Sequence, residues 1–234
     1  MDEKVSAIIP AHNEAEYIGD TVHAAKAIPG VTEVIVVDDA STDHTLEIAS
    51  SAGADKVISL NRNLGKGGAL NAALRSASGS IILLLDGDLG ASAVEAEKLL
   101  SPVIAGEADM TIAIFDGKSR NVESGQASRS GGFGTVVRTA RFGIRLLCGQ
   151  TIAAPLSGQR ALRREIVDNA GGFASKFGVE VALTIDALRM GCRVLEVPVG
   201  MVHRPSGRDF KGFIHRGRQL CDVVRLLAGK AFSR

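Results

Sequence analysis

Short apolar runs alternate with segments of helical spacing along the first half of the chain. The run "IILLL" at residues 81–85, bounded by Gly79 and Asp86, is typical of a strand buried on both faces. We expect strands at 5–10, 33–41, 54–60, 80–86 and 108–115, and helices at 13–27, 43–52, 65–77 and 91–106. Asn13 is the expected N-cap of the first helix. Repeated βα units of this length predict a parallel sheet with right-handed crossovers.

The alternation stops in the second half. Residues 116–134 are polar and glycine-rich, and we interpret them as a flexible loop beside the site, the alternative being a plain surface loop. Helices are expected near 135–148, 178–190 and 208–229, with a turn at 153–165 and a strand at 193–203. We therefore predict one large α/β domain with two parts, 1–107 and 108–205, followed by a C-terminal helix within 206–234.

Composition is that of a soluble globular protein. Hydrophobic residues make up 45% of the 234 residues, yet no run approaches the roughly 20 apolar residues that a membrane span requires. The acidic N-terminus "MDEKVSAIIP" is unlike a signal peptide. Three distant cysteines, Cys148, Cys192 and Cys221, exclude a disulfide framework and a CxxC metal site, and they favour a cytoplasmic location.

The net charge of +1 hides a basic C-terminus. Residues 200–234 contain eight Lys or Arg against two Asp, whereas the rest of the chain is acidic. Such a segment predicts an anionic partner, for example a phosphate or a lipid headgroup. Nucleic acid is disfavoured because aromatic residues for base stacking make up only 4% of the chain.

Polar residues gather where four predicted strands end. The four motifs are "PAHNE" (10–14), "VDDAS" (37–41), "NRNLGKGGALN" (61–71) and "DGD" (86–88). In an open α/β sheet, ligands bind at the edge formed by these strand ends. Asp86 and Asp88 point the same way from extended backbone, so they can converge on a cation, with Gly87 allowing close approach. The alternative is that Asp88 only caps the following turn.

The glycine-rich motif predicts an anion site. Gly65 opens a helix whose free N–H groups and dipole favour an anion, and Lys66 adds a positive charge unless it is simply solvated at the helix start. Asp38 or Asp39 could accept hydrogen bonds from a base and from ribose hydroxyls. The motif matches neither the P-loop nor GxGxxG, which disfavours an ATPase or a dehydrogenase. A nucleotide diphosphate suits this pocket.

Together with "SGQRALRRE" and "HRPSGRDFKGFIHRGRQ", these motifs resemble family-2 glycosyltransferases, in the branch of dolichol-phosphate mannose synthases and glucosyl- or mannosyl-phosphoglycerate synthases. The likeness spans residues 5 to 225. It implies the α/β GT-A fold, a Rossmann-like nucleotide-diphospho-sugar transferase fold with a mainly parallel central sheet flanked by helices. It also implies transfer of a hexose from a nucleotide sugar with a divalent cation, Mg²⁺ or Mn²⁺. Residues 1–107 then bind the nucleotide sugar, and 108–205 bind the acceptor.

The resemblance assigns roles to individual residues. Those that match nucleotide-contacting positions are Pro10, Ala11, Asn13, Glu14, Asp38, Asp39, Gly65, Lys66 and Asp86. Asp88 and His203 match metal ligands, although His203 could instead be a satisfied histidine at a strand end. Asp86 and Asp88 are also assigned to catalysis, and Arg204 and Arg208 to the phosphates.

Two further residues have alternative roles. Glu180 matches the acceptor-side acid, for which we weigh a catalytic role as acceptor ligand or base against a charge at a helix start. Arg160 is either an acceptor-binding arginine or part of a structural ion pair.

The resemblance also orders the substrates. UDP-glucose is the favoured donor, with GDP-mannose second, and the arginines favour a phosphate-bearing acceptor such as phosphoglycerate or a polyprenyl phosphate. The basic amphipathic helix at 208–229 could lie on the inner membrane face, or pack on its own domain or on a second subunit in a homodimer. A nucleotidyltransferase and a non-catalytic nucleotide-sugar binder are the alternative functions.

Overall fold

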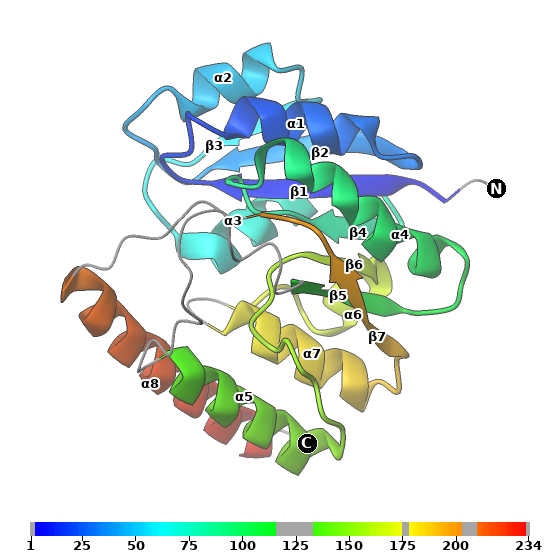
Figure 1. The fold of residues 1–234 in the computed structure, drawn as a ribbon, viewed down its shortest axis with the longest axis vertical. Coiled ribbons are helices and arrows are strands. Elements are labelled where there is room, and N and C mark those ends of the chain that lie inside the picture. Colours follow the sequence, from blue (N-terminus) through cyan, green and yellow to red (C-terminus); the bar gives the residue numbers. More distant parts are fainter. Residues whose placement is uncertain (1–2, 116–132, 175–177, 203–209, 233–234) are drawn as a thin grey trace.

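The protein, analysed as a computed structural model, has one central sheet covered by helices (Figure 1). The structure describes residues 3–115, 133–174, 178–202 and 210–232. The strands are β1 (Val5–Ala11), β2 (Val31–Asp38), β3 (Lys56–Ser59), β4 (Ile81–Leu84), β5 (Met110–Phe115), β6 (Arg160–Arg163) and β7 (Val194–Val199). The helices are α1 (Ile18–Ala27), α2 (Thr45–Ser51), α3 (Gly65–Leu74), the 3₁₀ helix η1 (Gly90–Ala96), α4 (Glu97–Ile104), α5 (Phe133–Cys148), α6 (Arg164–Asn169), α7 (Val179–Arg189) and α8 (Phe210–Phe232).

The seven strands lie in the order β3-β2-β1-β4-β6-β5-β7. Neighbouring strands are parallel except for β6, which runs antiparallel to both β4 and β5. The predicted α/β fold with a mainly parallel sheet is therefore confirmed. None of the helices in the described ranges combines the length and the hydropathy needed to cross a membrane.

Side-chain alternation along the strands divides the core into two layers. In β1, Ile8 faces one layer while Ala7 and Ile9 face the other, as the two-residue period of a strand requires. The Ile8 layer packs against α3, α5, α6 and α7, and the opposite layer packs against α1, α2, η1 and α4. Figure 1 shows these two groups of helices on opposite sides of the sheet. Both faces of the central strands are consequently buried.

Several predicted boundaries are wrong. The first helix begins at Ile18, not at residue 13, with Tyr17 at its cap position. The predicted turn at 153–165 contains β6 and the start of α6. The predicted helix 91–106 is split into η1 and α4. The predicted loop 116–134 lies outside the described residues up to 132, and α5 begins at Phe133.

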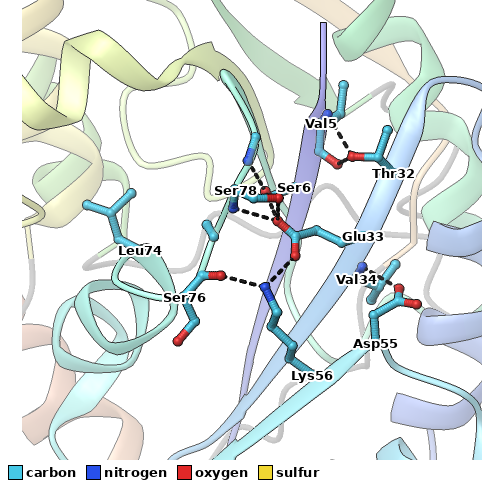
Figure 2. A network of polar contacts seen from close by, with 12 residues as sticks. Val5, Ser6, Thr32, Glu33, Val34, Asp55, Lys56, Leu74, Ser76 and Ser78 are labelled. Atoms are coloured by element: carbon cyan, nitrogen blue, oxygen red, sulfur yellow. Dashed lines mark hydrogen bonds and ion pairs between the residues drawn. The ribbon is translucent and has the colours of Figure 1, made fainter.

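A polar network closes the sheet at the edge where the parallel strands begin (Figure 2). One oxygen of the buried Glu33 carboxylate accepts hydrogen bonds from Ser6 Oγ (2.6 Å), Ser78 N (2.6 Å) and Ser78 Oγ (2.8 Å). The other accepts from Lys56 Nζ at 2.7 Å. Burial alone would raise the pKa of Glu33, but Lys56 and the two serines lower it from 4.5 to about 2. This network joins the beginnings of β1, β2 and β3 to the turn before β4.

Candidate active site

A cleft of about 130 Å³ lies at the carboxyl ends of the parallel strands. Its lining residues are Pro10, Ala11, His12, Asp39, Lys66 and Asp86. The sequence predicts all of them except His12 as nucleotide-binding residues. They come from the ends of β1, β2 and β4 and from the first turn of α3. The crossovers of the fold thus bring these distant residues to one place.

Hydrogen bonds between loops hold the cleft in shape. Asn13 has a φ of 58°, donates from its backbone N–H to Ser41 Oγ (2.9 Å) and accepts at Oδ1 from the Thr42 N–H (2.8 Å). Asn13 therefore ties the loop after β1 to the loop after β2 and is not a helix cap. The backbone N–H of Glu14 donates to Thr45 Oγ1 at 2.8 Å, which fixes the same loop to α2. Neither residue lines the cleft, so their direct contact with a nucleotide stays a prediction.

The adjacent acids of the second motif are both buried. Asp39 Oδ1 accepts a hydrogen bond from the Leu64 N–H at 2.6 Å, which joins the end of β2 to the turn before α3. Asp38 Oδ1 accepts from the Ser41 N–H at 3.2 Å. Gly65 has a φ of 72° and begins α3, as the sequence predicts. Of these residues only Asp39 lines the cleft, and the nucleotide roles of Asp38 and Gly65 remain predictions.

Lys66 lies between two carboxylates at the centre of the site. Its Nζ is 2.6 Å from Asp86 Oδ1 and 3.2 Å from Glu180 Oε1 in the first turn of α7. Burial would lower the pKa of Lys66, but the negative charges of Asp86 and Glu180 outweigh this effect and raise the pKa above its ordinary value. Lys66 therefore stays protonated and holds both Asp86, after β4, and Glu180, in α7, in place.

A larger cavity of about 460 Å³ also reaches Asp86. It is lined by Asp86, Ile114, Phe115, Val137, Arg141 and residues 153–159. Gly158 lies against the central cluster, because a Cβ at this position would be 2.2 Å from Lys66 Nζ and 3.1 Å from Asp86 Oδ2. Asp86 is thus the residue that the cleft and the cavity share.

Gln159 and Ser157 are site residues that the sequence analysis missed. Gln159 is fully buried, and its Nε2 donates to Asp86 Oδ2 at 2.5 Å. Gln159 Oε1 and Ser157 Oγ are buried and have no hydrogen-bond partner within the described chain. Buried polar atoms are usually paired, so these two atoms in the cavity wall are candidates to bind hydroxyls of a substrate. The motif "SGQR" marks this loop in the sequence, and its glutamine, rather than its arginine, contacts Asp86.

The prediction that Arg160 contacts an anionic acceptor is wrong, because its side chain is fully buried. Its guanidinium donates to Ser157 O (2.8 Å), Pro155 O (3.2 Å) and Thr184 Oγ1 (2.8 Å). Burial lowers the pKa of Arg160 to about 10, which still leaves it protonated at neutral pH. Arg160 is a structural residue that fixes the cavity wall to α7.

The "DGD" turn is rigidly placed. Thr21 in α1 donates through Oγ1 to Gly87 O at 3.0 Å and accepts from the Gly90 N–H at 2.8 Å. Leu89, rather than Asp88, occupies the cap position of η1. Asp86 and Asp88 carry the hard carboxylate oxygens that suit Mg²⁺ or Mn²⁺ as ligands.

The described ranges do not contain a complete set of metal ligands. Within them, no three His, Cys, Asp or Glu side chains are grouped closely enough to hold a metal ion. The predicted ligand His203 and the predicted phosphate contacts Arg204 and Arg208 lie outside the described residues. The two aspartates therefore fit a divalent cation as part of its ligand set, and the roles of these three residues remain predictions.

Comparison with known proteins assigns the family. The family model described as Glycosyl transferase family 2 matches residues 6–171, a span that includes the cleft, the "DGD" turn and β6. The chain belongs to glycosyl transferase family 2. The resemblance inferred from the strand-end motifs is thus confirmed.

Relatives and a solved structure support the same fold and site region. The glucosyl-3-phosphoglycerate synthase of Mycolicibacterium smegmatis is 33% identical over 196 residues, covering 78% of this chain and 63% of the relative. Glycosyltransferase AglJ of Haloferax volcanii is 29% identical over 208 residues, covering 88% of this chain and 66% of the relative. The chain therefore spans about two thirds of these relatives.

The structure of glucosyl-3-phosphoglycerate synthase from Mycobacterium tuberculosis with Mn²⁺, uridine diphosphate and phosphoglyceric acid superimposes with a TM-score of 0.77 at 27% identity. The superposition covers 98% of this chain and 79% of the mycobacterial chain. The GT-A fold predicted from the sequence motifs is confirmed.

Proposed function

We propose that this family-2 protein is a metal-dependent glycosyltransferase that moves a hexose from a UDP-sugar, with glucose favoured, to a phosphate-bearing acceptor. The proposal depends above all on one observation, that the nucleotide-side cleft and the larger cavity share Asp86. A sugar joined to a diphosphate must lie between its nucleotide and its acceptor, and Asp86 is the residue common to both hollows. The mycobacterial structure, a complex with Mn²⁺, uridine diphosphate and phosphoglyceric acid, supports the proposed classes of metal, nucleotide and acceptor.

Each group of residues has a role in this reaction. We propose that Asp39 and the backbone around Pro10 and Ala11 hold the nucleoside, and that Asp86 and Asp88 would hold Mg²⁺ or Mn²⁺. The cation, when bound, would stabilise the negative charge that develops on the departing diphosphate. Gln159 Oε1 and Ser157 Oγ are placed to hydrogen bond sugar or acceptor hydroxyls.

Glu180 and Lys66 are proposed to act on the acceptor side. The Lys66 ammonium keeps the Glu180 carboxylate in position. An ionised Glu180 can accept a hydrogen bond, or a proton, from an acceptor hydroxyl as the bond from oxygen to the anomeric carbon forms. A phosphate oxygen that attacks the sugar itself is already ionised and would need no base.

The decisive experiment measures nucleoside diphosphate release. The full chain is incubated with UDP-glucose, UDP-galactose and GDP-mannose, with Mn²⁺ or Mg²⁺ or with EDTA, in the presence of 3-phosphoglycerate or a polyprenyl phosphate. We expect metal-dependent UDP release from UDP-glucose that rises with a phosphate-bearing acceptor. Release of pyrophosphate or of a nucleoside monophosphate would instead indicate a nucleotidyltransferase, and binding without turnover would indicate a sensor. Preferential GDP release with polyprenyl phosphate would favour the alternative mannosyltransferase.

We infer a cytoplasmic protein without a nucleic-acid partner. The three cysteines Cys148, Cys192 and Cys221 are free thiols, which suits a reducing compartment. Contact with the inner membrane face and formation of a homodimer are separate proposals, and both can be tested on the outer surface of α5 and α8.

A further inference from the structure

The three most exposed large apolar side chains of the described chain lie on one pair of helices. Leu146 is 72% exposed and Phe142 is 68% exposed on α5, and Val224 is 49% exposed on α8. Phe142 and Leu146 are one turn apart, so they project from the same side of α5. Such a concentration of exposed apolar area is unusual for a surface that meets only water.

These side chains lie beside the contact between the two helices. Figure 1 shows α5 and α8 side by side on the side of α7 away from the sheet, and the two helices are in contact. They pack tightly at Gly143, because a Cβ at this position would lie 2.4 Å from the Leu227 side chain. Phe142 and Leu146 flank Gly143 on α5, and Val224 precedes Leu227 by one turn on α8. We call the strip formed by these three residues the seam.

The seam is bordered by positive charge. Arg138 and Arg145 on α5 and Arg225 on α8 are exposed and form no ion pair within the described chain. Helix α5 contains no Asp or Glu. Folding does not require this pattern, because α5 already buries Val136, Ala140 and Ile144 against the core. The outer side of α5 and α8 is therefore apolar along the seam and cationic beside it.

This pattern favours an anionic lipid bilayer over a second copy of the chain. Pairing two copies through the seam would bring the arginines of one copy towards those of the other, and like charges repel. A bilayer containing anionic lipids instead attracts the arginines and accepts the apolar side chains at its interface.

We propose that the seam and its flanking arginines dock on the surface of an anionic phospholipid membrane. Helix α5 has a second role in the geometry, since Val137 and Arg141 line the larger cavity. Docking would therefore bring the cavity next to the bilayer, where a lipid-linked phosphate acceptor could reach it. This last link rests on the proposed glycosyl transfer, whereas docking itself does not.

Flotation of the full chain with vesicles tests the docking. Vesicles of phosphatidylcholine with phosphatidylglycerol are compared with vesicles of phosphatidylcholine alone, at low and at high salt. We expect binding to the anionic vesicles only, and weaker binding at high salt. The double variant Arg138→Gln/Arg145→Gln should lower the partition coefficient roughly 30-fold. Phe142→Ser/Leu146→Ser should lower it by more than roughly tenfold.

Matched variants elsewhere on the surface serve as controls. Arg62→Gln/Arg75→Gln removes two exposed charges from another part of the chain, and Leu195→Ser removes an exposed apolar side chain from β7. Both should bind anionic vesicles more tightly than the seam variants do. Thermal unfolding confirms that each variant is folded, and the arginine variant changes only exposed side chains.

Three results would overturn the docking proposal. The first is the absence of binding to anionic vesicles, and the second is an equal loss of vesicle binding in the control and seam variants. The third is a dimer in light scattering that the seam variants convert to a monomer, without any vesicle binding. The last result would assign the seam to self-association. Vesicle binding without any nucleotide-sugar turnover would refute the proposed function but leave the docking intact.

Discussion

Glu33 provides a test of the packing away from the site. Replacing Glu33 with Gln keeps the size of the side chain and one acceptor oxygen for Ser6 and Ser78 but removes the negative charge that faces Lys56 (Figure 2). Because Glu33 is only 8% exposed, solvent screens this charge weakly. We expect the variant to fold and to be less stable at neutral pH.

The size of the effect follows from the pKa of Glu33. Folding lowers this pKa from 4.5 to about 2, and a shift of this size corresponds to about 3 kcal/mol of the free energy of unfolding. A depressed pKa contributes stability that is fully present above the unfolded value and is lost as the pH falls towards the folded value. The stability gap between wild type and Glu33→Gln should therefore be about 3 kcal/mol at pH 7 and should shrink from pH 5 towards pH 2.

Urea unfolding followed by circular dichroism measures this gap, since the chain has no tryptophan to report by fluorescence. Glu47→Gln is the matched control, because the Glu47 side chain is 66% exposed and lies 3.8 Å from His44 in a surface pair that should contribute little. A gap between wild type and Glu33→Gln that stays the same from pH 7 to pH 3 would show that the charge of Glu33 does not stabilise the fold.

Three further variants test the site. Asp88→Asn should lower kcat by roughly 100-fold or more without changing the unfolding midpoint, and near-normal turnover would remove Asp88 from the metal site. Gly158→Ala would place a Cβ 2.2 Å from Lys66 Nζ, so we expect a loss of transfer activity, whereas Gly229→Ala, whose Cβ would meet nothing within 4 Å, should retain it. Arg160→Met should destabilise the fold by about 2–4 kcal/mol in urea, because the carbonyls that Arg160 now binds would stay buried without a donor; an unchanged midpoint would contradict its structural role.

Much of the fold follows from local patterns in the sequence. Continuous apolar runs such as "IILLL" are buried on both faces by the crossovers, so the parallel strands could be predicted from the chain alone. β6 could not, because a strand of four residues with an arginine at each end carries no periodic signal. Its position between β4 and β5 depends on pairing with strands far away in the sequence.

The site residues also differ in whether local sequence or long-range packing determines them. Asp39, Lys66 and Asp86 could be predicted because each directly follows a strand or opens a helix, and strand ends converge. Asn13 has the sequence of a helix cap, but its φ of 58° and its contacts with Ser41 and Thr42 arise only when β2 lies beside β1. Arg160 looks like an anion ligand in the sequence, and only the packing of α7 buries it.

The most direct test of a nucleotide-diphosphate site held by acidic residues is calorimetric titration of the full chain with UDP. Titrations with Mn²⁺ or Mg²⁺ are compared with titrations in EDTA, and GDP and UDP-glucose are included as additional ligands. We predict that UDP and UDP-glucose bind in the presence of the metal and that chelation weakens binding by at least roughly tenfold. No heat of binding for UDP, UDP-glucose or GDP, with or without metal, would contradict the proposed role of this edge of the sheet.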